Sequence, residues 1–158
     1  MAARYAFLFG EYELTIDEKN RMLVPAEVRK ALIPERDGEA FFLVMGVNRT
    51  LWLYPEKYYE ELVAQDPTDI LPGEEALAFD QMHFAMASRL EWDKQGRVLI
   101  PEKTLRRTEL HREVMLIGVR DHLELWDRDE WNAHREQLLN RRAEVALKAK
   151  QARLQPPG

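Results

Sequence analysis

The sequence contains no cysteine among its 158 residues. This absence excludes disulfides, a thiol nucleophile and thiolate sites for zinc or iron–sulfur clusters. No apolar run approaches the roughly 20 residues that a membrane-spanning helix needs. The apolar patch near the start is interrupted by Glu11, which indicates a strand rather than a signal peptide. With 46% hydrophobic and 32% charged residues, the chain can bury a core, and we expect a soluble cytoplasmic protein.

Positive charge is scarce overall, because 23 Lys and Arg face 28 Asp and Glu and leave a net charge of −5. The distribution is uneven. Residues 37–92 carry three basic side chains against eleven acidic ones, whereas 93–112 carry six against three and 140–154 carry five against one. A protein that contacts phosphates needs only a local basic face. The alternative is a solvated surface of mixed sign.

The chain repeats itself. Residues 17–25 read DEKNRMLVP, and residues 93–101 read DKQGRVLIP, at an offset of 76. The two segments share an Asp, an Arg four positions later, an apolar triplet and a Pro. Two such segments indicate an internal duplication when a second match follows in the same order.

The second match lies downstream of each first one. Residues 42–55, FLVMGVNRTLWLYP, align with residues 114–127, VMLIGVRDHLELWD, at an offset of 72. This alignment pairs Gly46 with Gly118. Two matched blocks in the same order indicate an internal duplication and not a chance match.

Each copy predicts the same local structure. Residues 12–16 alternate in polarity, as a half-buried strand does, and a turn over 17–21 leads to a return strand at 22–24. Asn20 and Gly96 occupy the same place in the two turns, and these residue types best tolerate a positive φ. The proline that follows each return strand suits the first turn of a short helix.

The second block of each copy predicts a further hairpin. The apolar runs FFLVMGV and VMLIGV indicate strands buried on both faces, and short turns connect them to LWLY and LELW. Helices are expected from residue 55 to about residue 64, over 74–90 after a breaker-rich connection at 65–73, and from residue 127 onward. The last residues, 155–158, are expected to be frayed.

We therefore predict a mainly β protein with flanking helices, of α+β content. Its first repeat spans 7–65, a connecting segment with a helix spans 66–90, the second repeat spans 91–139, and a basic helical tail spans 140–158. A repeat of about 50 residues rarely supplies enough core alone. We expect the two copies to pair about a pseudo-twofold axis and to complete one composite β-barrel.

Residues suited to catalysis or metal binding are sparse. The four histidines, at 83, 111, 122 and 134, have no second ligand at the spacing of a zinc motif. The sequence shows no nucleophile elbow, phosphate-binding loop or dinucleotide fingerprint. We assign no catalytic residue, metal or cofactor. An enzyme on this fold would need a pocket lined by His83 or by clustered carboxylates.

The repeated turn is the most informative site. Asp17 and Arg21, like Asp93 and Arg97, lie four positions apart across a turn. One interpretation is an Asp–Arg bridge that pins the hairpin, with the Asp accepting backbone hydrogen bonds. The other is an exposed loop whose basic side chains contact phosphates or base edges, for which the arginine fork is suited. The basic side chains in question are Lys19, Arg21, Lys94 and Arg97.

Further basic residues are predicted on the short helix after each turn. These are Arg29 and Lys30 in the first copy, and Arg106 with Arg107 in the second. On the same surface as the turns, they would hold a nucleic-acid backbone. A hairpin tip or a two-stranded ribbon fits the major groove of double-stranded DNA.

The chain resembles the MraZ family of bacterial regulators, which are built of two SpoVT/AbrB-type repeats. The matching residues are Gly10-Glu11-Tyr12, the two D-x-x-x-R frames with the LVP and LIP that follow them, LWLYP at 51–55 and ELWD at 124–127. The resemblance runs from about Phe7 to about Leu139. One D-x-x-x-R frame is weakly specific, but two copies with LWLYP and ELWD in order are highly specific.

The resemblance implies a swapped-hairpin, AbrB-like barrel and ring-shaped homo-oligomers, with no enzyme activity and no cofactor. It implies sequence-specific binding to short direct repeats in the promoter of the protein's own operon, which heads the division and cell-wall gene cluster, usually with repression. It implies that Asp17, Arg21, Asp93 and Arg97 form the recognition loops. We thus expect a cytoplasmic, nucleoid-associated regulator with no membrane partner. The alternative is an oligomeric scaffold that does not bind DNA, which the acidic net charge and the basic tail favour.

Three positions depart from the family pattern. Asn20 stands where the family usually has Gly, and Phe9 stands where Arg is common. The Leu-Arg pair of the second copy comes one residue late, as Leu105–Arg106 instead of the spacing of Val28–Arg29. Because one residue turns a helix by about 100°, we expect Arg106 to point differently from Arg29.

Overall fold

A computed structural model describes residues 3–155 of the chain. Over these residues it contains eight strands and seven helices. The first elements are β1 (Glu11–Thr15), β2 (Arg21–Leu23), α1 (Ala26–Ala31), α2 (Pro34–Asp37), β3 (Ala40–Met45), β4 (Leu51–Pro55) and α3 (Glu56–Gln65). Those that follow are α4 (Glu74–Ala85), β5 (Ser88–Glu91), β6 (Arg97–Leu99), α5 (Glu102–Thr108), β7 (Glu113–Gly118), β8 (Leu123–Asp127), α6 (Arg128–Asn140) and α7 (Arg142–Leu154). Except for Gln155, the end expected to be frayed lies outside the described residues.

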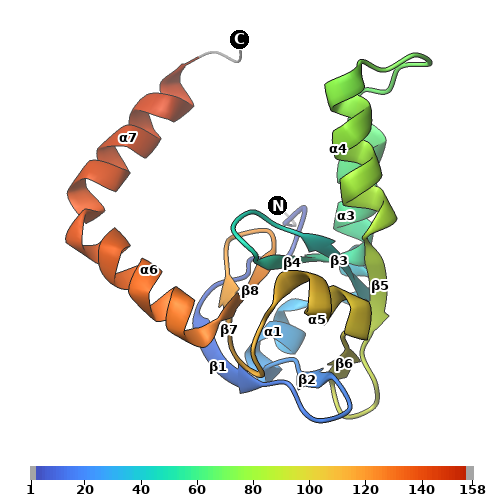
Figure 1. The fold of residues 1–158 in the computed structure, drawn as a ribbon, viewed down its shortest axis with the longest axis vertical. Coiled ribbons are helices and arrows are strands. Elements are labelled where there is room, and N and C mark those ends of the chain that lie inside the picture. Colours follow the sequence, from blue (N-terminus) through green and yellow to red (C-terminus); the bar gives the residue numbers. More distant parts are fainter. Residues whose placement is uncertain (1–2, 156–158) are drawn as a thin grey trace.

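Both sheets are antiparallel, and each mixes strands from the two copies (Figure 1). Six strands form one sheet in the order β1-β7-β8-β4-β3-β5, and β2 pairs with β6 in a separate two-stranded ribbon. β1 therefore pairs with a strand of the second copy, β5 pairs with a strand of the first, and β2 pairs with its own counterpart. Neither copy completes a sheet alone, so the two copies fold as one unit.

The prediction of a closed barrel is wrong for the described residues, although the α+β content is confirmed. β1 and β5 are the two edges of the six-stranded sheet, and the ribbon contains only β2 and β6. The cause lies in the two turns. After Asp17 and after Asp93 the chain leaves the large sheet, and each three-residue return strand pairs with the other return strand.

The strand pairing has pseudo-twofold symmetry. At the centre of the ribbon, Met22 faces Val98, which is its counterpart at the offset of 76. β4 and β8 are related likewise across the facing pair Trp52 and Glu124, which are counterparts at the offset of 72. One approximate axis thus relates the two copies in the ribbon and in the middle of the large sheet.

β3 and β7 correspond with an offset of 73 and not with the 72 of the sequence alignment. Phe41 faces Pro55 in the first hairpin, and Val114 faces Asp127 in the second. Because Pro55 and Asp127 are counterparts at 72, Phe41 and Val114 are counterparts at 73. The turn between β3 and β4 is one residue longer than the turn between β7 and β8, and the pairing of the two glycines is therefore wrong by one residue.

The hydrophobic core is shared between the copies. Met22 and Val98 of the ribbon pack in one cluster with Phe41, Leu116 and Leu125 of the large sheet, and all five side chains are fully buried. Burial of each such side chain contributes about 1.5–3 kcal/mol. The ribbon and the large sheet are therefore held together by apolar contacts, although their ladders are separate.

The helix expected over 74–90 is shorter than predicted. α4 ends at Ala85, and β5 follows, with Leu90 facing Phe41 of β3. Leu90 is buried while its neighbours Arg89 and Glu91 are exposed. This alternation is the period of a strand, and the pairing with β3 overrides the helical spacing at the end of the segment.

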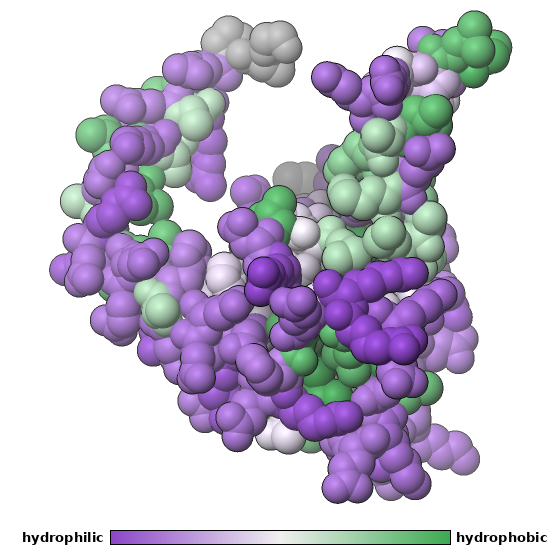
Figure 2. All heavy atoms as spheres, viewed as in Figure 1, coloured by the Kyte–Doolittle hydropathy of each residue, from purple (hydrophilic) through white to green (hydrophobic). Residues whose placement is uncertain are grey.

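Two helical arms extend away from the sheet, and their far ends lie on the side opposite the ribbon (Figure 1). α3 and α4 form one arm, and α6 followed by α7 forms the other. The helix expected from residue 127 is broken in two because Arg141 leaves helical geometry, with φ −117° and ψ 20°. Hydrophobic side chains gather along the α3–α4 arm (Figure 2). Within residues 3–155, none of the helices combines the length and the apolar character that a lipid bilayer requires.

Gly118 allows a close approach of backbone, and its replacement tests the packing of the N-terminal segment on β7. A Cβ at Gly118 would lie 2.2 Å from the backbone nitrogen of Phe9. We expect Gly118→Ala to lower the free energy of unfolding by about 2 kcal/mol or more, because backbone atoms cannot move aside cheaply. Gly73→Ala is the control, since a Cβ there meets nothing within 4 Å, and should change stability by less than about 0.5 kcal/mol. Urea unfolding followed by circular dichroism compares them, and equal effects would contradict the close packing.

Candidate functional site

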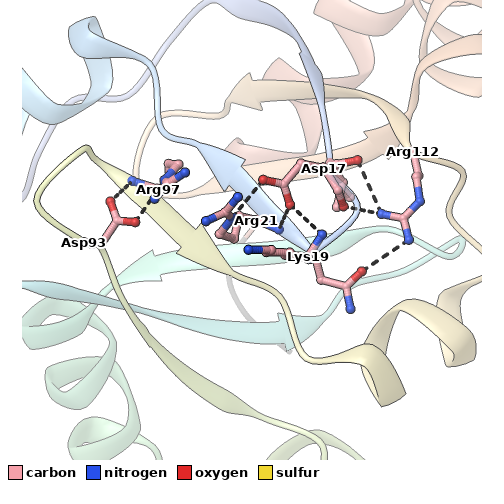
Figure 3. Close-up of polar contacts among 8 residues, drawn as sticks. Asp17, Lys19, Arg21, Asp93, Arg97 and Arg112 are labelled. Atoms are coloured by element: carbon pink, nitrogen blue, oxygen red, sulfur yellow. Dashed lines mark hydrogen bonds and ion pairs between the residues drawn. The ribbon is translucent and has the colours of Figure 1, made fainter.

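The first turn is closed by hydrogen bonds to one carboxylate (Figure 3). Oδ1 of Asp17 accepts from the backbone N–H groups of Lys19 and Arg21, each at 2.9 Å, and Oδ2 accepts from Nε of Arg21 at 2.8 Å. The backbone N–H of Asp17 donates to the carbonyl of Arg21 at 2.9 Å. Asp17 therefore fixes both the path of the backbone and the position of the Arg21 guanidinium.

The second turn repeats this geometry. Oδ1 of Asp93 accepts from the backbone N–H groups of Gln95 and Arg97, and Oδ2 accepts from Nε of Arg97, all at 2.9 Å. The fourth residue of each turn has a positive φ, 64° at Asn20 and 81° at Gly96. The geometry is that of the pinning interpretation. A contact between the same arginines and a ligand stays a prediction.

These hydrogen bonds favour the charged form of both carboxyl groups. The backbone N–H of Arg21 lowers the pKa of Asp17, aided by the Arg21 guanidinium and the N–H of Lys19. The pKa of Asp93 is lowered in the same way by Arg97 and by the N–H of Gln95. Both turns are therefore pinned by ionised carboxylates at neutral pH.

The ribbon presents two arginines on one outward face. The middle residue of each ribbon strand has no exposed surface, so its neighbours along the strand point outward. On this outward face Arg21 lies opposite Leu99, and Leu23 lies opposite Arg97. Leu23 and Leu99 are 47% and 60% exposed. The face thus combines two arginines and two leucines in a pseudo-twofold arrangement.

The arginine forks of this face are only partly used inside the protein. Among residues 3–155, Nε is the one guanidinium nitrogen of Arg21, and likewise of Arg97, that has a hydrogen-bond acceptor. Nε carries one of the five N–H donors of an arginine, and the terminal nitrogens carry the other four. Each arginine is therefore held in place while most of its donors remain available.

The first turn is braced by an arginine of the second copy. The Arg112 guanidinium donates to the backbone carbonyls of Ile16 and Asp17, and to Oδ1 of Asn20 at 3.4 Å (Figure 3). The offset of 73 places Glu39 at the equivalent position of the first copy. A carboxylate cannot donate such hydrogen bonds, so the part of the chain that the structure describes has no equivalent brace on the second turn.

The second turn is covered by an arginine of the first copy. A Cβ at Gly96 would come within 2.8 Å of Cζ of Arg29. Nε of Arg29 donates to the carbonyl of Val24 at 3.0 Å, and the N–H of Val24 donates to the carbonyl of Gly96 at 2.8 Å. Arg29 of the first copy therefore lies at the turn of the second copy. The surface around this turn is formed by residues of both copies.

Of the remaining predicted residues, Lys19 and Lys94 lie in the turns, Lys30 lies on α1 and Arg106 lies on α5. The side chains of Lys19, Lys30 and Lys94 are exposed, and their ammonium groups have no hydrogen bond or ion pair within residues 3–155. At the offset of 76, Leu105 takes the position of Arg29. Arg106 instead lines a hollow beside the first turn, which it shares with Glu18, Asn20 and Arg112. The late Leu-Arg pair thus changes the surface around one turn only.

Sequence reasoning missed three residues of this surface. Leu23 and Leu99 stand inside apolar triplets that suggest burial. The signal that could have found them is the length of the strand, because a buried middle residue turns both neighbours outward. Arg112 is 95 positions away from Asp17, and no local pattern places it at the first turn.

His122 lies in the turn between β7 and β8, where its ring is buried and bridges two carboxylates. Nδ1 lies 2.8 Å from Oδ1 of Asp121, Nε2 lies 2.8 Å from Oε2 of Glu124, and the ring stacks on Trp52. Burial lowers the pKa of His122, but its two carboxylate partners outweigh burial and raise the pKa above its usual value. Residues 3–155 contain no group of three or more His, Cys, Asp or Glu side chains that could hold a metal ion.

The fold and the site define a class of protein, in which two tandem repeats exchange strands and present twin Asp–Arg turns on one β-ribbon. The family model described as "MraZ protein, putative antitoxin-like" matches residues 7–78 and 83–155 of the chain. The chain belongs to the MraZ family.

Three curated relatives, each named "Transcriptional regulator MraZ", are similar over most of the chain. The protein of Clostridium tetani (strain Massachusetts / E88) is 31% identical over 144 residues, covering 87% of this chain and 98% of the relative. That of Carboxydothermus hydrogenoformans is 36% identical over 125 residues, covering 78% and 82%. That of Heliobacterium modesticaldum is 34% identical over 141 residues, covering 88% and 94%.

Asp17→Asn tests whether the charge of the carboxylate pins the first turn. Because folding lowers the pKa of Asp17, its stabilisation is present above the unfolded pKa of about 4 and is lost as the pH falls through the folded pKa. Asparagine keeps an acceptor for the backbone N–H groups but removes the charge that faces Arg21. We expect the variant to be less stable at neutral pH and less sensitive to acid.

The measurement is thermal unfolding between about pH 3 and about pH 7, a range that spans ordinary carboxyl titration. Glu18→Gln is the control, because this neighbouring carboxylate is exposed and accepts no hydrogen bond within residues 3–155. It should follow the wild-type profile. Parallel profiles for the wild type and Asp17→Asn would show that the charge has no pinning role.

Proposed function

We propose that this protein is a sequence-specific DNA-binding transcriptional repressor that contacts double-stranded DNA with the β2–β6 ribbon and its two turns. The observation that carries the proposal is the outward face on which Arg21 and Arg97 are held through Nε while their terminal nitrogens stay available. An arginine fork matches O6 and N7 of guanine in the major groove, and a two-stranded ribbon fits that groove. The names of the relatives agree with this function.

The side chains of the surface divide between base and backbone contacts in this proposal. The two arginines are oriented by Asp17 and Asp93 before DNA arrives, so little side-chain freedom is lost on binding. The exposed Leu23 and Leu99 offer apolar contact to thymine methyl groups. Phosphate contacts position the protein without reading sequence, and we assign them to Lys19, Arg29, Lys30, Lys94 and Arg106.

We place the function at short direct repeats upstream of the protein's own division and cell-wall gene cluster, at the nucleoid in the cytoplasm. The repeats 7–65 and 91–139 act as one swapped-hairpin unit, joined by 66–90, and the chain assembles into a ring-shaped homo-oligomer. A ring presents several copies of the ribbon, and linked contacts on repeated sites multiply through effective concentration. No catalytic step, cofactor or membrane partner belongs to the proposal.

An oligomeric scaffold without specific DNA binding is the second candidate. The observations that favour it are the net charge of −5 and the two arms of exposed helices. A salt-dependent complex with the DNA upstream of its own gene separates the two functions, because phosphate contacts release counterions and a scaffold makes none.

Arg21→Ala tests base contact by the ribbon. Fluorescence anisotropy compares a duplex from upstream of the protein's own gene with a shuffled duplex, at salt concentrations from about 50 to 200 mM. We expect Arg21→Ala to cost about 1–3 kcal/mol of binding free energy per subunit on the native duplex. Lys19→Ala should weaken both duplexes evenly and lower the salt slope by about one.

Lys57→Ala is the matched control, because Lys57 is an exposed basic residue on α3, in the arm away from the ribbon. It should leave affinity unchanged, and circular dichroism should show that all variants are folded. Wild-type protein that binds neither duplex would instead favour the scaffold. Affinity of Arg21→Ala equal to that of the wild type would remove the ribbon from the proposal.

The number of direct repeats tests the assembly in the same assay. Duplexes with one, two and four repeats are compared at constant length and constant salt. We expect affinity to rise steeply with repeat number, because each added repeat is bound at high effective concentration. The same affinity for all three duplexes would contradict binding by a multivalent ring.

A further inference from the structure

Within residues 3–155, α7 packs on no element other than the end of α6, which precedes it. Its 13 side chains are exposed, except for the half-buried Ala149. An isolated helix of this length is marginal in water. Leu147 and Leu154 lie seven positions apart and therefore on one face, 58% and 75% exposed, with Lys150 between them. α7 thus presents on one face two exposed leucines with a lysine between them.

The other arm carries an apolar groove. A hollow of about 380 Å³ is lined by Leu62 and Val63 of α3 and by Phe79 and Phe84 of α4, with Asp66 also in its lining. Figure 2 shows hydrophobic side chains gathered along this arm, whereas the side chains of α7 are mostly hydrophilic. His83 lines the same hollow and is hydrogen-bonded to the hydroxyl of Tyr59 at 2.7 Å. The walls are mostly apolar, which suits a docking surface better than a catalytic pocket.

The charges of the two arms are complementary. Residues 56–80, which span the α3–α4 arm up to Asp80, carry eight acidic side chains against one basic, and 140–154 carry five basic against one acidic. Within residues 3–155, Asp66 and Asp80 have no ion-pair partner, and neither do Lys150 and Arg153. The acidic arm and the basic helix each lack the ion-pair partners that the other supplies.

We propose that α7 of one copy docks in the α3–α4 groove of a second copy. Leu147 and Leu154 cover the apolar walls of the groove, while Lys150 and Arg153 face Asp66 in its lining and Asp80 on α4. α7 has 13 residues and α4 has 12, so at about 1.5 Å per residue the two helices match in length. The two arms stand apart in one chain (Figure 1), which makes a second copy the occupant.

This contact is heterologous, because the donating and accepting surfaces differ. Each copy gives one arm and accepts another, and such contacts continue from copy to copy until a ring closes. The inference rests on the homo-oligomer of the proposed function and names the surfaces that build it. The ribbon lies at the opposite end of the molecule and stays uncovered (Figure 1).

An exchange of charge between two full-length variants tests the contact. The first variant is Lys150→Glu with Arg153→Glu, and the second is Asp66→Lys with Asp80→Lys. In each variant alone the two surfaces have like charges, and we expect it to sediment as a single chain of 18.6 kDa, whereas the wild type forms larger species. In an equimolar mixture every helix of one variant matches the groove of the other, so the larger species returns.

Charge-retaining Lys150→Arg with Arg153→Lys is the control and should sediment as the wild type does. Recovery on mixing also shows that both variants are folded. A wild type that sediments as a single chain, a variant that keeps the wild-type mass alone, or a mixture that does not recover would each overturn the proposal. Sedimentation is measured without DNA, so failure of the proposed DNA binding leaves this result unchanged.

Discussion

The antiparallel pairing of β2 with β6 is the constraint on which the rest of the structure depends. Because these return strands pair with each other, two turns that are 76 residues apart in sequence meet at one end of the molecule. The preceding strands, β1 and β5, must then join the sheet strands of the other copy. The inner residues of the ribbon, Met22 and Val98, enter the shared core. Stability and the outward face therefore have the same origin.

The Asp–Arg turn shows that a structural and a binding role need not compete. Nε of Arg21 closes the turn on Asp17, and the terminal nitrogens of the same guanidinium remain available for a ligand. The two turns are nevertheless not equivalent. Arg112 donates to the backbone of the first, while the second packs its glycine beneath Arg29. Pseudo-twofold symmetry thus holds for the backbone, and side chains of the opposite copy make each turn distinct.

Local features of this fold could be predicted from the sequence, because neighbouring residues determine them. The positive φ at Asn20 and Gly96 and the short helix after each proline follow from residue type and spacing. The partner of a three-residue strand is a long-range choice, so the open sheet and the exposed face of the ribbon could not be predicted. The same holds for 88–91, where pairing with β3 makes a strand of residues with helical spacing. The Asp–Arg pairs of the site could be predicted from the sequence because their residues are only four positions apart. The contact of Arg112 with the first turn could not, because it joins residues about 95 positions apart.

The acidic net charge is easier to reconcile with DNA binding when the charges are located. The basic turn residues lie at the ribbon, and the acidic excess of 56–80 lies largely on an arm at the opposite end (Figure 1). At physiological salt the Debye length is about 8 Å, so charges on the arm act weakly on a ligand at the ribbon. If the basic α7 of a second copy covers the acidic arm, assembly also neutralises the charge that would repel DNA. Although each chain has a net charge of −5, the assembled protein then offers DNA its basic ribbons. Self-association therefore reduces the electrostatic repulsion that would oppose DNA binding.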